Sequence, residues 1–396
     1  MRILFDSNAP WAATGYGTQT KLFPQRLKAL GHEVAIMAFY GLEGAIINWN
    51  GMQIYPRWAH PYGLDIMTSH AQHFKSDIII TLLDAWVFDS NAFKQANQRW
   101  CPWFMVDCEP LQLAVYRQIK ESFMPIVCSK HAEMECSKAG LQTVYVPLGV
   151  DTKIFKPVAD RAEARERTKL PKDKFVVGMV AANKDPFDRK GFHSQIEAFA
   201  NLHRKYPDTF LFMHTAQPPA PGLGFSALNL REFANYHGLR EGQDYAFCDQ
   251  YGYVLGYSEE HMVSLYSSFD VLLNASKGEG FGIPIVEAQA CGTPVIVGDW
   301  TAMSELLFAG WRVEKHEAER LWNGQGAYMF TPRVSAITDR LVQAYKAAGE
   351  TWPEAALGAA KYDADVITET YWKPALDTIQ DRMTGADTEL KLVKFP

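Results

Sequence analysis

The chain has 396 residues, of which 47% are hydrophobic and 21% are charged, and this length suits two globular domains better than one. Its formal net charge of −6 argues against a broad nucleic-acid-binding face, because such a face needs clustered lysine and arginine. The six cysteines form no Cys-x2-Cys pair and no apolar run reaches bilayer length, which predicts reduced thiols and a cytoplasmic protein without a transmembrane segment.

The first half of the chain alternates short apolar strands with helical segments. The predicted strands span residues 3–5, 34–37, 77–83, 103–106, 125–129 and 143–146. Buried strands separated by helices predict a parallel, doubly wound sheet, so the fold class is α/β. Ligands bind beyond the carboxyl ends of such strands. This places Asp84, Asp107 and Glu109 on a functional rim, together with the glycine-containing loop 15–17.

The loop that precedes the first predicted helix reads Thr14-Gly-Tyr-Gly-Thr18. Its Gly-x-Gly spacing is superficially like a dinucleotide-binding fingerprint, but the third glycine and the downstream acid are missing. A tight turn into a helix is the simpler alternative.

The second half of the chain continues the same alternation. Strands are predicted at 175–180, 209–214 and 245–248, with helices up to residue 206 and at 228–236 and 259–269. Lys184, Arg189 and Lys190 lie just before the first of these helices. Their charge and the positive end of the helix would suit a diphosphate; a solvated basic loop is the alternative.

A strand at 270–274, a glycine-rich loop, a helix from Pro284 to Cys291 and a strand at 294–297 follow. This unit presents backbone N–H groups and a positive helix end to an anion. It also carries Glu279 and Glu287, which suit neutral sugar or ribose hydroxyls better than phosphates. The alternative is a solvated loop glutamate plus a first-turn glutamate that favours the helix dipole.

The string Ser276–Pro294, SKGEGFGIPIVEAQACGTP, resembles the Glu-x7-Glu motif of retaining, nucleotide-sugar-dependent glycosyltransferases with the GT-B fold (family 4 type, glycogen-synthase-like superfamily). Weaker similarity covers residues 147–157 and 183–191. The resemblance implies two Rossmann-like, doubly wound parallel-sheet domains facing a cleft. Their expected bounds are 1–157 for the acceptor-side domain, about 361–384 for a C-terminal helix that completes it, 158–360 for the nucleotide-sugar domain and 385–396 for a tail.

The resemblance also implies roles for individual residues. Glu279 would contact the transferred sugar and Glu287 would hold the ribose. Lys184 and Lys190 would stabilise the leaving diphosphate, with Arg189 supplementing Lys184, which replaces the usual arginine. The other implied donor-binding residues are Gly17, Leu255, Gly280, Phe281, Gly282 and Ile283.

The first half departs from the family pattern. Tyr16 takes the first place of the usual Gly-Gly pair, and Leu148 replaces an asparagine. No histidine follows the strand at 103–106, where the family carries one that contacts the sugar. Asp107 is therefore a catalytic candidate, and the acceptor-side candidates are Tyr16, Asp84 and Glu109.

These inferences predict a retaining transferase of the hexosyltransferase type that moves a sugar from a nucleotide diphosphate sugar to an acceptor hydroxyl. The implied reaction occurs on the front face, with the leaving phosphate helping to deprotonate the acceptor. No metal or other cofactor is expected, and the favoured donor is a UDP- or GDP-sugar.

Two alternatives stay open: a non-catalytic nucleotide-sugar-binding protein, and a GT-B-type nucleotide-sugar epimerase, which the Glu279–Glu287 string disfavours. The acceptor is also open among a lipid, a polysaccharide, a protein, a small molecule and a modified nucleobase. Peripheral membrane contact and the oligomeric state are left undecided by the sequence.

Overall fold

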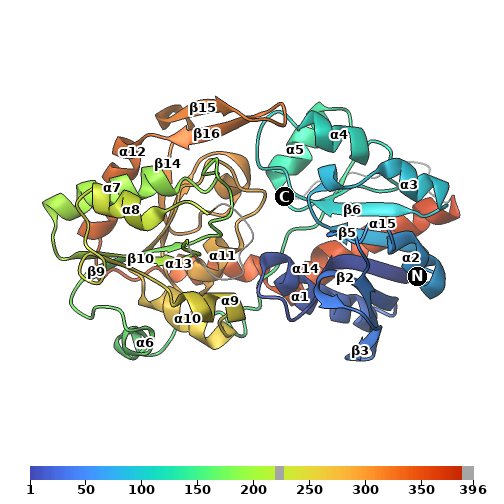
Figure 1. The fold of residues 1–396 in the computed structure, drawn as a ribbon, viewed down its shortest axis with the longest axis horizontal. Coiled ribbons are helices and arrows are strands. Elements are labelled where there is room, and N and C mark those ends of the chain that lie inside the picture. The colour runs from blue at the N-terminus through green and yellow to red at the C-terminus, as the bar shows by residue number, and fades with distance from the viewer. Residues whose placement is uncertain (219–226, 386–396) are drawn as a thin grey trace. The chain divides into compact units, whose positions relative to one another are not determined.

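A computed structural model describes residues 1–218 and 227–385, and the chain divides into two compact units (Figure 1). Within the described chain, unit 1 holds residues 1–105, 111–149 and 364–385, and unit 2 holds 106–110 and 150–363. These bounds differ from the expected ones in two ways. The main boundary lies at 149/150 instead of 157/158, and residues 106–110 cluster with unit 2. The expected tail lies outside the described residues, apart from Gly385.

Unit 1 is built on an eight-stranded sheet in the order β3-β4-β2-β1-β5-β6-β7-β8. Its strands are β1 (Arg2–Asn8), β2 (Glu33–Glu43), β3 (Ile47–Trp49), β4 (Met52–Arg57), β5 (Ile78–Leu82), β6 (Trp100–Phe104), β7 (Ile126–Val127) and β8 (Val144–Tyr145). Its helices include α1 (Gly15–Ala29), α2 (Met67–Phe74), the 3-10 turn η1 (Ala85–Val87), α3 (Ser90–Gln95), α4 (Leu113–Ile119), α5 (Lys130–Lys138), α14 (Ala364–Ile367), the π-helical turn η5 (Thr368–Trp372) and α15 (Lys373–Thr384). All neighbouring strands are parallel except β3 and β4.

The C-terminal helices complete the core of unit 1. Trp372 is fully buried, and its ring centroid lies 4.8 Å from that of Trp103 and 5.9 Å from that of Phe23 on α1. Arg26 of α1 forms an ion pair with Asp365 at 2.8 Å. Burial of these large rings stabilises the fold by several kcal/mol. This explains why the C-terminal helices pack against the sheet of unit 1.

Unit 2 is built on a six-stranded sheet in the order β11-β10-β9-β12-β13-β14, with every neighbouring pair parallel. The strands are β9 (Phe175–Val180), β10 (Thr209–His214), β11 (Tyr245–Phe247), β12 (Val271–Asn274), β13 (Val295–Gly298) and β14 (Gly310–Val313). Helices cover both faces, with α7 (Phe192–Lys205) and α8 (Leu230–Tyr236) on one side and α9 (Gln250–Leu255) and α10 (Glu259–Ser268) on the other (Figure 1). The remaining helices and turns are α6 (Arg161–Thr168), α11 (Ile283–Ala290), η2 (Thr301–Glu305), η3 (Lys315–Glu317), α12 (Val334–Lys346), α13 (Pro353–Ala359) and η4 (Ala360–Tyr362).

Unit 2 also carries an antiparallel hairpin that the sequence analysis did not predict. Its strands are β15 (Ala318–Trp322) and β16 (Tyr328–Pro332), which pair over their full length. Asn323 orders the connecting turn, because its side-chain oxygen accepts hydrogen bonds from the amides of Gln325 and Ala327 at 3.0 and 3.1 Å. The hairpin follows the last strand of the parallel sheet and leads into α12.

Two element boundaries in unit 1 differ from the prediction near candidate residues. α1 begins at Gly15, so the segment 15–17 forms the first helical turn and not a loop. Thr14 caps this helix, since its hydroxyl oxygen accepts a hydrogen bond from the Gly17 amide at 3.0 Å. β6 starts three residues earlier than expected, at Trp100, and ends at Phe104, because the buried apolar run continues through Pro102.

Candidate active site

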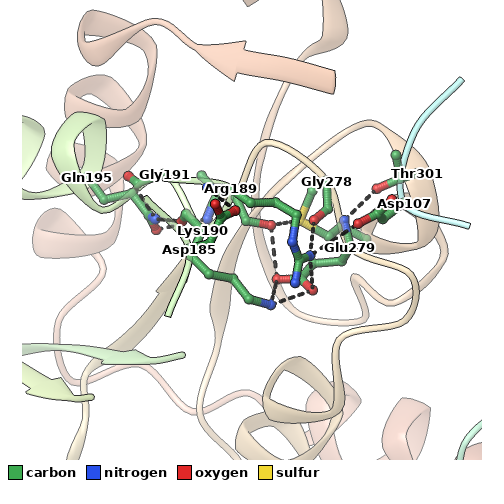
Figure 2. Close-up of polar contacts among 12 residues, drawn as sticks. Asp107, Asp185, Arg189, Lys190, Gly191, Gln195, Gly278, Glu279 and Thr301 are labelled. Atoms are coloured by element: carbon green, nitrogen blue, oxygen red, sulfur yellow. Dashed lines mark hydrogen bonds and ion pairs between the residues drawn. The ribbon is translucent and has the colours of Figure 1, made fainter. Parts of the chain in front are cut away.

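Glu279 lies in the loop between β12 and α11 and is only 6% exposed. Both of its carboxylate oxygens accept hydrogen bonds from the Lys190 ammonium group, at 2.7 and 2.8 Å, and the Ser276 hydroxyl donates a third at 3.0 Å (Figure 2). The interpretation of Glu279 as a solvated loop residue is therefore wrong. Burial opposes ionisation, but the charges of Lys190 and Arg189 outweigh it and hold the pKa of Glu279 below its ordinary value.

Arg189 contacts three acidic or carbonyl groups. Its Nη1 donates a hydrogen bond to the carbonyl oxygen of Gly278 at 2.9 Å and lies 3.4 Å from Asp107 Oδ2 and 3.7 Å from Glu279 Oε2 (Figure 2). We call the four side chains of Asp107, Arg189, Lys190 and Glu279 the charged cluster. Burial lowers the pKa of Lys190, and the Glu279 carboxylate partly offsets that effect.

The loop before α7 folds so that two of its three cations reach the charged cluster. The Asp185 carboxylate accepts hydrogen bonds from the amides of Phe187 and Arg189 at 2.9 and 3.2 Å. Asp188 accepts from the Phe192 amide at the start of α7, at 2.7 Å. Lys184, by contrast, is exposed and takes part in no ion pair within residues 1–218 and 227–385.

Asp107 and Glu109 were expected on the first domain, but residues 106–110, here called the bridging segment, belong to unit 2. Glu109 pairs with Tyr328 of β16 through two backbone hydrogen bonds, at 3.0 and 2.7 Å. The Lys315 ammonium group also contacts both Glu109 carboxylate oxygens, at 2.9 and 2.8 Å. The hairpin thus holds the segment and sets Asp107 beside Arg189.

The backbone of Glu279 is fixed by η2, which lies in a segment, residues 299–307, whose sequence resembles one that lines the donor pocket in the same glycosyltransferases. Its amide donates a hydrogen bond to the Thr301 hydroxyl at 3.1 Å, and its carbonyl oxygen accepts one from the Ala302 amide at 3.2 Å. Thr301 has a φ of 53°, which is strained for a β-branched residue. Nothing in the sequence around Thr301 signals this conformation.

The predicted donor-binding loop leads directly into α11. Gly282, with a φ of 121°, precedes the helix, and Ile283 is its first residue. Phe281 is buried, and its ring centroid lies 5.6 Å from that of Tyr362. The amides at this end of α11 and neighbouring Gly280 therefore lie beside Glu279 along the chain, where an anion could bind.

Glu287 is half-buried in α11, and the Tyr266 hydroxyl donates a hydrogen bond to its Oε2 at 2.7 Å. It lies beyond the first turn of the helix, so the helix-dipole interpretation does not hold. Burial raises the pKa of Glu287 to about 7, which the Tyr266 hydrogen bond only partly offsets. Additional hydrogen-bond donors would stabilise the ionised form of this carboxyl group, and ribose hydroxyls would supply them.

Leu255 ends α9 and is exposed. The segment around it lies near the carboxyl end of β10, where the His214 ring centroid is 5.4 Å from Tyr253 and 5.1 Å from Tyr257. Burial lowers the pKa of His214 to about 4, so its ring is neutral at physiological pH. A neutral aromatic cluster at a strand's carboxyl end suits a planar base.

The candidates in unit 1 lie where its parallel strands end. Gly17 is in the first turn of α1, where an added Cβ would overlap the carbonyl oxygen of Ala12, and Tyr16 packs partly against the core. Asp84 precedes η1, directly after β5. Because the position of unit 1 relative to unit 2 is not determined, the roles of Tyr16, Gly17 and Asp84 and the cleft itself stay predictions.

Two further polar residues of β1 escaped the sequence analysis, which ended this strand at Phe5. Both carboxyl oxygens of Asp6 and the side-chain oxygen of Asn8 are buried without a hydrogen-bond partner in the described chain. Burial raises the pKa of Asp6 well above its ordinary value. Both residues lie at the carboxyl end of the strand.

Within the described residues, no group of three or more histidine, cysteine, aspartate or glutamate side chains is arranged to hold a metal ion. The chain contains one Asp-x-Asp sequence, Asp363-Ala-Asp365. Asp363 accepts hydrogen bonds from Thr152, whereas Asp365 pairs with Arg26. All six cysteines are buried, and none of them forms a disulfide bond within the described residues. A search of the described helices for one long and apolar enough to cross a membrane found none.

The chain is similar to known glycosyltransferases over part of its length. Residues 174–346 match the family model described as glycosyl transferases group 1. The chain is 28% identical over 217 residues to the uncharacterized glycosyltransferase 335 of Sulfolobus islandicus rod-shaped virus 1, covering 52% of this chain and 56% of that protein. It is 30% identical over 189 residues to a GDP-mannose-dependent alpha-(1-6)-phosphatidylinositol dimannoside mannosyltransferase of Mycobacterium tuberculosis, covering 46% and 43%. The matches thus span about half the length of these relatives.

Solved structures resemble the whole chain. Sucrose-phosphate synthase from Thermosynechococcus elongatus matches with a TM-score of 0.74 at 17% identity, covering 98% of this chain and all of that one. Anabaena HepE in complex with UDP-glucose matches with a TM-score of 0.69 at 15% identity, covering 95% and 100%. At these identities the likeness establishes the fold alone. The chain therefore has the GT-B fold, and its residues 174–346 match the group 1 glycosyl transferase model.

Proposed function

We propose that this protein is a glycosyltransferase that transfers a sugar from a nucleotide diphosphate sugar to an acceptor hydroxyl, with retention of the anomeric configuration and without a metal ion. The observation that carries this proposal is the buried ion pair of Glu279 with Lys190, beside Arg189 and at the start of α11. It lies within the segment that matches the group 1 glycosyl transferase model.

The ion pair leaves both partners able to act on a donor. An ammonium group has three N–H donors, and Glu279 uses two of those on Lys190. The third can meet the diphosphate as negative charge builds on it during departure. Glu279 is held ionised and accepts hydrogen bonds only, so it suits a sugar hydroxyl rather than a phosphate.

Support for a front-face reaction comes from the surroundings of the two carboxylates in the charged cluster. Glu279 is bound by Lys190 and Ser276, and Asp107 lies 3.4 Å from Arg189. Paired in this way, neither is a strong nucleophile, which a double displacement would require. The leaving phosphate is then the base that takes the acceptor proton. The anomeric configuration of the product, measured from its proton coupling constant, tests retention.

For the donor we favour a UDP- or GDP-sugar. One structural neighbour was solved with UDP-glucose and one relative is named for GDP-mannose. Glu287 would bind the ribose, and the ring cluster around His214 would accept the base. Melting temperatures measured with UDP, GDP and ADP should rise with one of the first two.

Turnover decides between a transferase and the alternatives. Glu279→Gln should keep nucleoside diphosphate binding but lose release of sugar from the donor. If wild-type protein binds the donor tightly and neither hydrolyses nor transfers it, the chain is a binding protein. Release of a free sugar with inverted C2 configuration would instead identify an epimerase.

A further inference from the structure

Four large aromatic side chains are exposed where the parallel strands of unit 1 end. Trp11 follows β1, Tyr40 lies near the end of β2, Trp58 follows β4, and Trp86 lies in η1 after β5. Their exposed fractions are 47%, 57%, 72% and 44%. We call these four residues the aromatic rim. Clustered exposed aromatic surface is unfavourable in water and therefore marks a binding surface.

The four strands are consecutive neighbours in the sheet, in the order β4-β2-β1-β5. Neighbouring strands lie about 4.8 Å apart, so the rim extends over roughly 15 Å. Carboxyl ends of parallel strands are the edge at which α/β sheets bind ligands. The rim thus lies where a substrate of unit 1 would be expected to approach.

Part of the rim is held rigidly. The Trp11 indole nitrogen donates a hydrogen bond to the Gly41 carbonyl oxygen at 2.8 Å, and the Ala9 amide donates one to the Tyr40 carbonyl oxygen, also at 2.8 Å. The pairing of β1 with β2 shifts register between Ser7 and Asn8, which places Tyr40 opposite Asn8. The Trp11 ring is therefore held in place and loses little conformational entropy when a ligand stacks on it.

The charge of the rim restricts what can bind there. The segments 9–14, 40–46, 58–66 and 83–89, which carry the four aromatic residues, contain Glu43, Asp65, Asp84 and Asp89 but no lysine or arginine. Arg57, next to Trp58, is paired with Glu43. Nucleic acids and anionic membranes are held mainly by cations, so this acidic edge disfavours both.

We propose that the aromatic rim binds a neutral carbohydrate, which would be the acceptor if the proposed transferase function holds. Sugar rings present C–H faces that stack on indole and phenol rings, while their hydroxyls donate hydrogen bonds to carboxylates. The unpaired, buried side-chain oxygen of Asn8 lies at the same strand end and offers a further acceptor. Aromatic faces combined with acids, and without cations, match this ligand class.

The test measures binding of the full chain to neutral oligosaccharides of glucose, mannose and galactose, in α and β linkages, by titration calorimetry. At least one should bind with an affinity that does not change with salt. Trp58→Ala and Trp86→Ala should each weaken that binding roughly tenfold, and Trp58→Tyr should restore most of it. Tyr236→Ala, which removes an 83% exposed aromatic ring on α8 of unit 2, is the matched control and should change nothing.

Phosphatidylserine-containing vesicles and single-stranded RNA are assayed alongside. Tighter binding of the wild type to either than to every neutral oligosaccharide overturns the proposal, as does the absence of oligosaccharide binding. An equal loss in Tyr236→Ala overturns it too. Binding of UDP and GDP to the wild type is measured separately. If neither nucleotide binds, the proposed transferase function is wrong. The proposed carbohydrate binding is then still decided by the oligosaccharide titrations.

Discussion

The half-buried Glu287 accepts a hydrogen bond from Tyr266 and has a raised pKa, and this predicts a pH-dependent stability. Its pKa is about 7 in the folded protein against 4.5 for an exposed glutamate. Between these values the unfolded chain has lost the proton and the folded chain keeps it. The free energy of unfolding therefore falls as pH rises, by up to about 3 kcal/mol. Urea unfolding at the two ends of this range should show Glu287→Gln becoming more stable than wild type as pH rises.

The control for this experiment is Glu350→Gln, which alters an exposed glutamate. Its stability relative to wild type should not depend on pH. If the difference in unfolding free energy between Glu287→Gln and wild type stays constant over the whole pH range, Glu287 ionises normally. The argument that ribose hydroxyls stabilise its ionised form would then be lost.

The Lys190–Glu279 pair predicts strong coupling between its two partners. Lys190→Met leaves the buried Glu279 carboxylate with Arg189 as its remaining cation and Ser276 as its remaining hydrogen-bond donor. This should cost about 3 kcal/mol of stability, and adding Glu279→Gln should restore part of it. Turnover should fall by roughly a hundredfold in Lys190→Met, with a smaller loss of UDP or GDP affinity.

Lys184→Met is the matched control for this pair, because Lys184 is exposed. It should change stability by less than about 0.5 kcal/mol. If Lys184→Met reduces turnover as much as Lys190→Met does, Lys184 reaches the diphosphate in the donor complex and the ligand-free arrangement understates its role.

Sequence patterns located some of these residues better than others. Glu279, Arg189 and Lys190 lie in motifs, and the structure brings them together. Tyr266 and Thr301, which contact the two glutamates, were not predicted as site residues, although Thr301 lies in the segment 299–307 that resembles a donor-pocket segment. Their roles depend on how distant elements pack, which local sequence does not encode.

At the scale of elements, the contact between the β12–α11 loop and the bridging segment predicts a sharp steric effect. A Cβ on Gly278 would overlap the Asp107 carbonyl oxygen. This oxygen belongs to the backbone, so it cannot move aside by a rotamer change as a flexible side chain can. Gly278→Ala should displace the bridging segment, destabilise the fold by about 1–3 kcal/mol and speed amide exchange at Glu109 and Tyr328. Exchange is followed by mass spectrometry or NMR.

Gly324→Ala is the matched control, because no atom lies within 4 Å of its added Cβ. It lies in the turn of the same hairpin, so it tests whether the hairpin is simply sensitive to change. Unaltered exchange at Glu109 in Gly278→Ala would mean that the bridging segment is not held against this glycine in solution.

Regular elements were the easiest to predict. β9 and β10 have the predicted bounds, 175–180 and 209–214, because buried parallel strands are continuous apolar runs. The β3–β4 hairpin was missed although Asn50-Gly51 is a strong turn signal, with φ of 51° and 72°. β3 has only three residues and is mostly exposed, so no apolar alternation marked it. The bridging segment was assigned to the first domain because its pairing with β16 is a long-range contact.

At the scale of the whole molecule, the charged cluster predicts that transfer needs no metal ion. The diphosphate charge would be met by Arg189, Lys190 and the amides at the start of α11. Activity should be the same with EDTA as without it, and added magnesium or manganese should not raise it. Loss of transfer in EDTA that manganese restores would show instead that a cation joins the site when the donor binds.

The division of the chain into units bears on how such enzymes can be recombined. A contiguous piece covering 150–363 would lack Asp107 and Glu109, although both belong to unit 2. Tyr328 and Lys315 would lose their partners, and Arg189 one of its acids. If residues 150–363 are grafted into another protein, the recipient's own sequence therefore occupies the position of Asp107 in the charged cluster. Chimaeras that also graft 106–110 should regain the Asp107–Arg189 and Glu109–Lys315 pairs, so the charged cluster is inherited from two separate stretches of the gene.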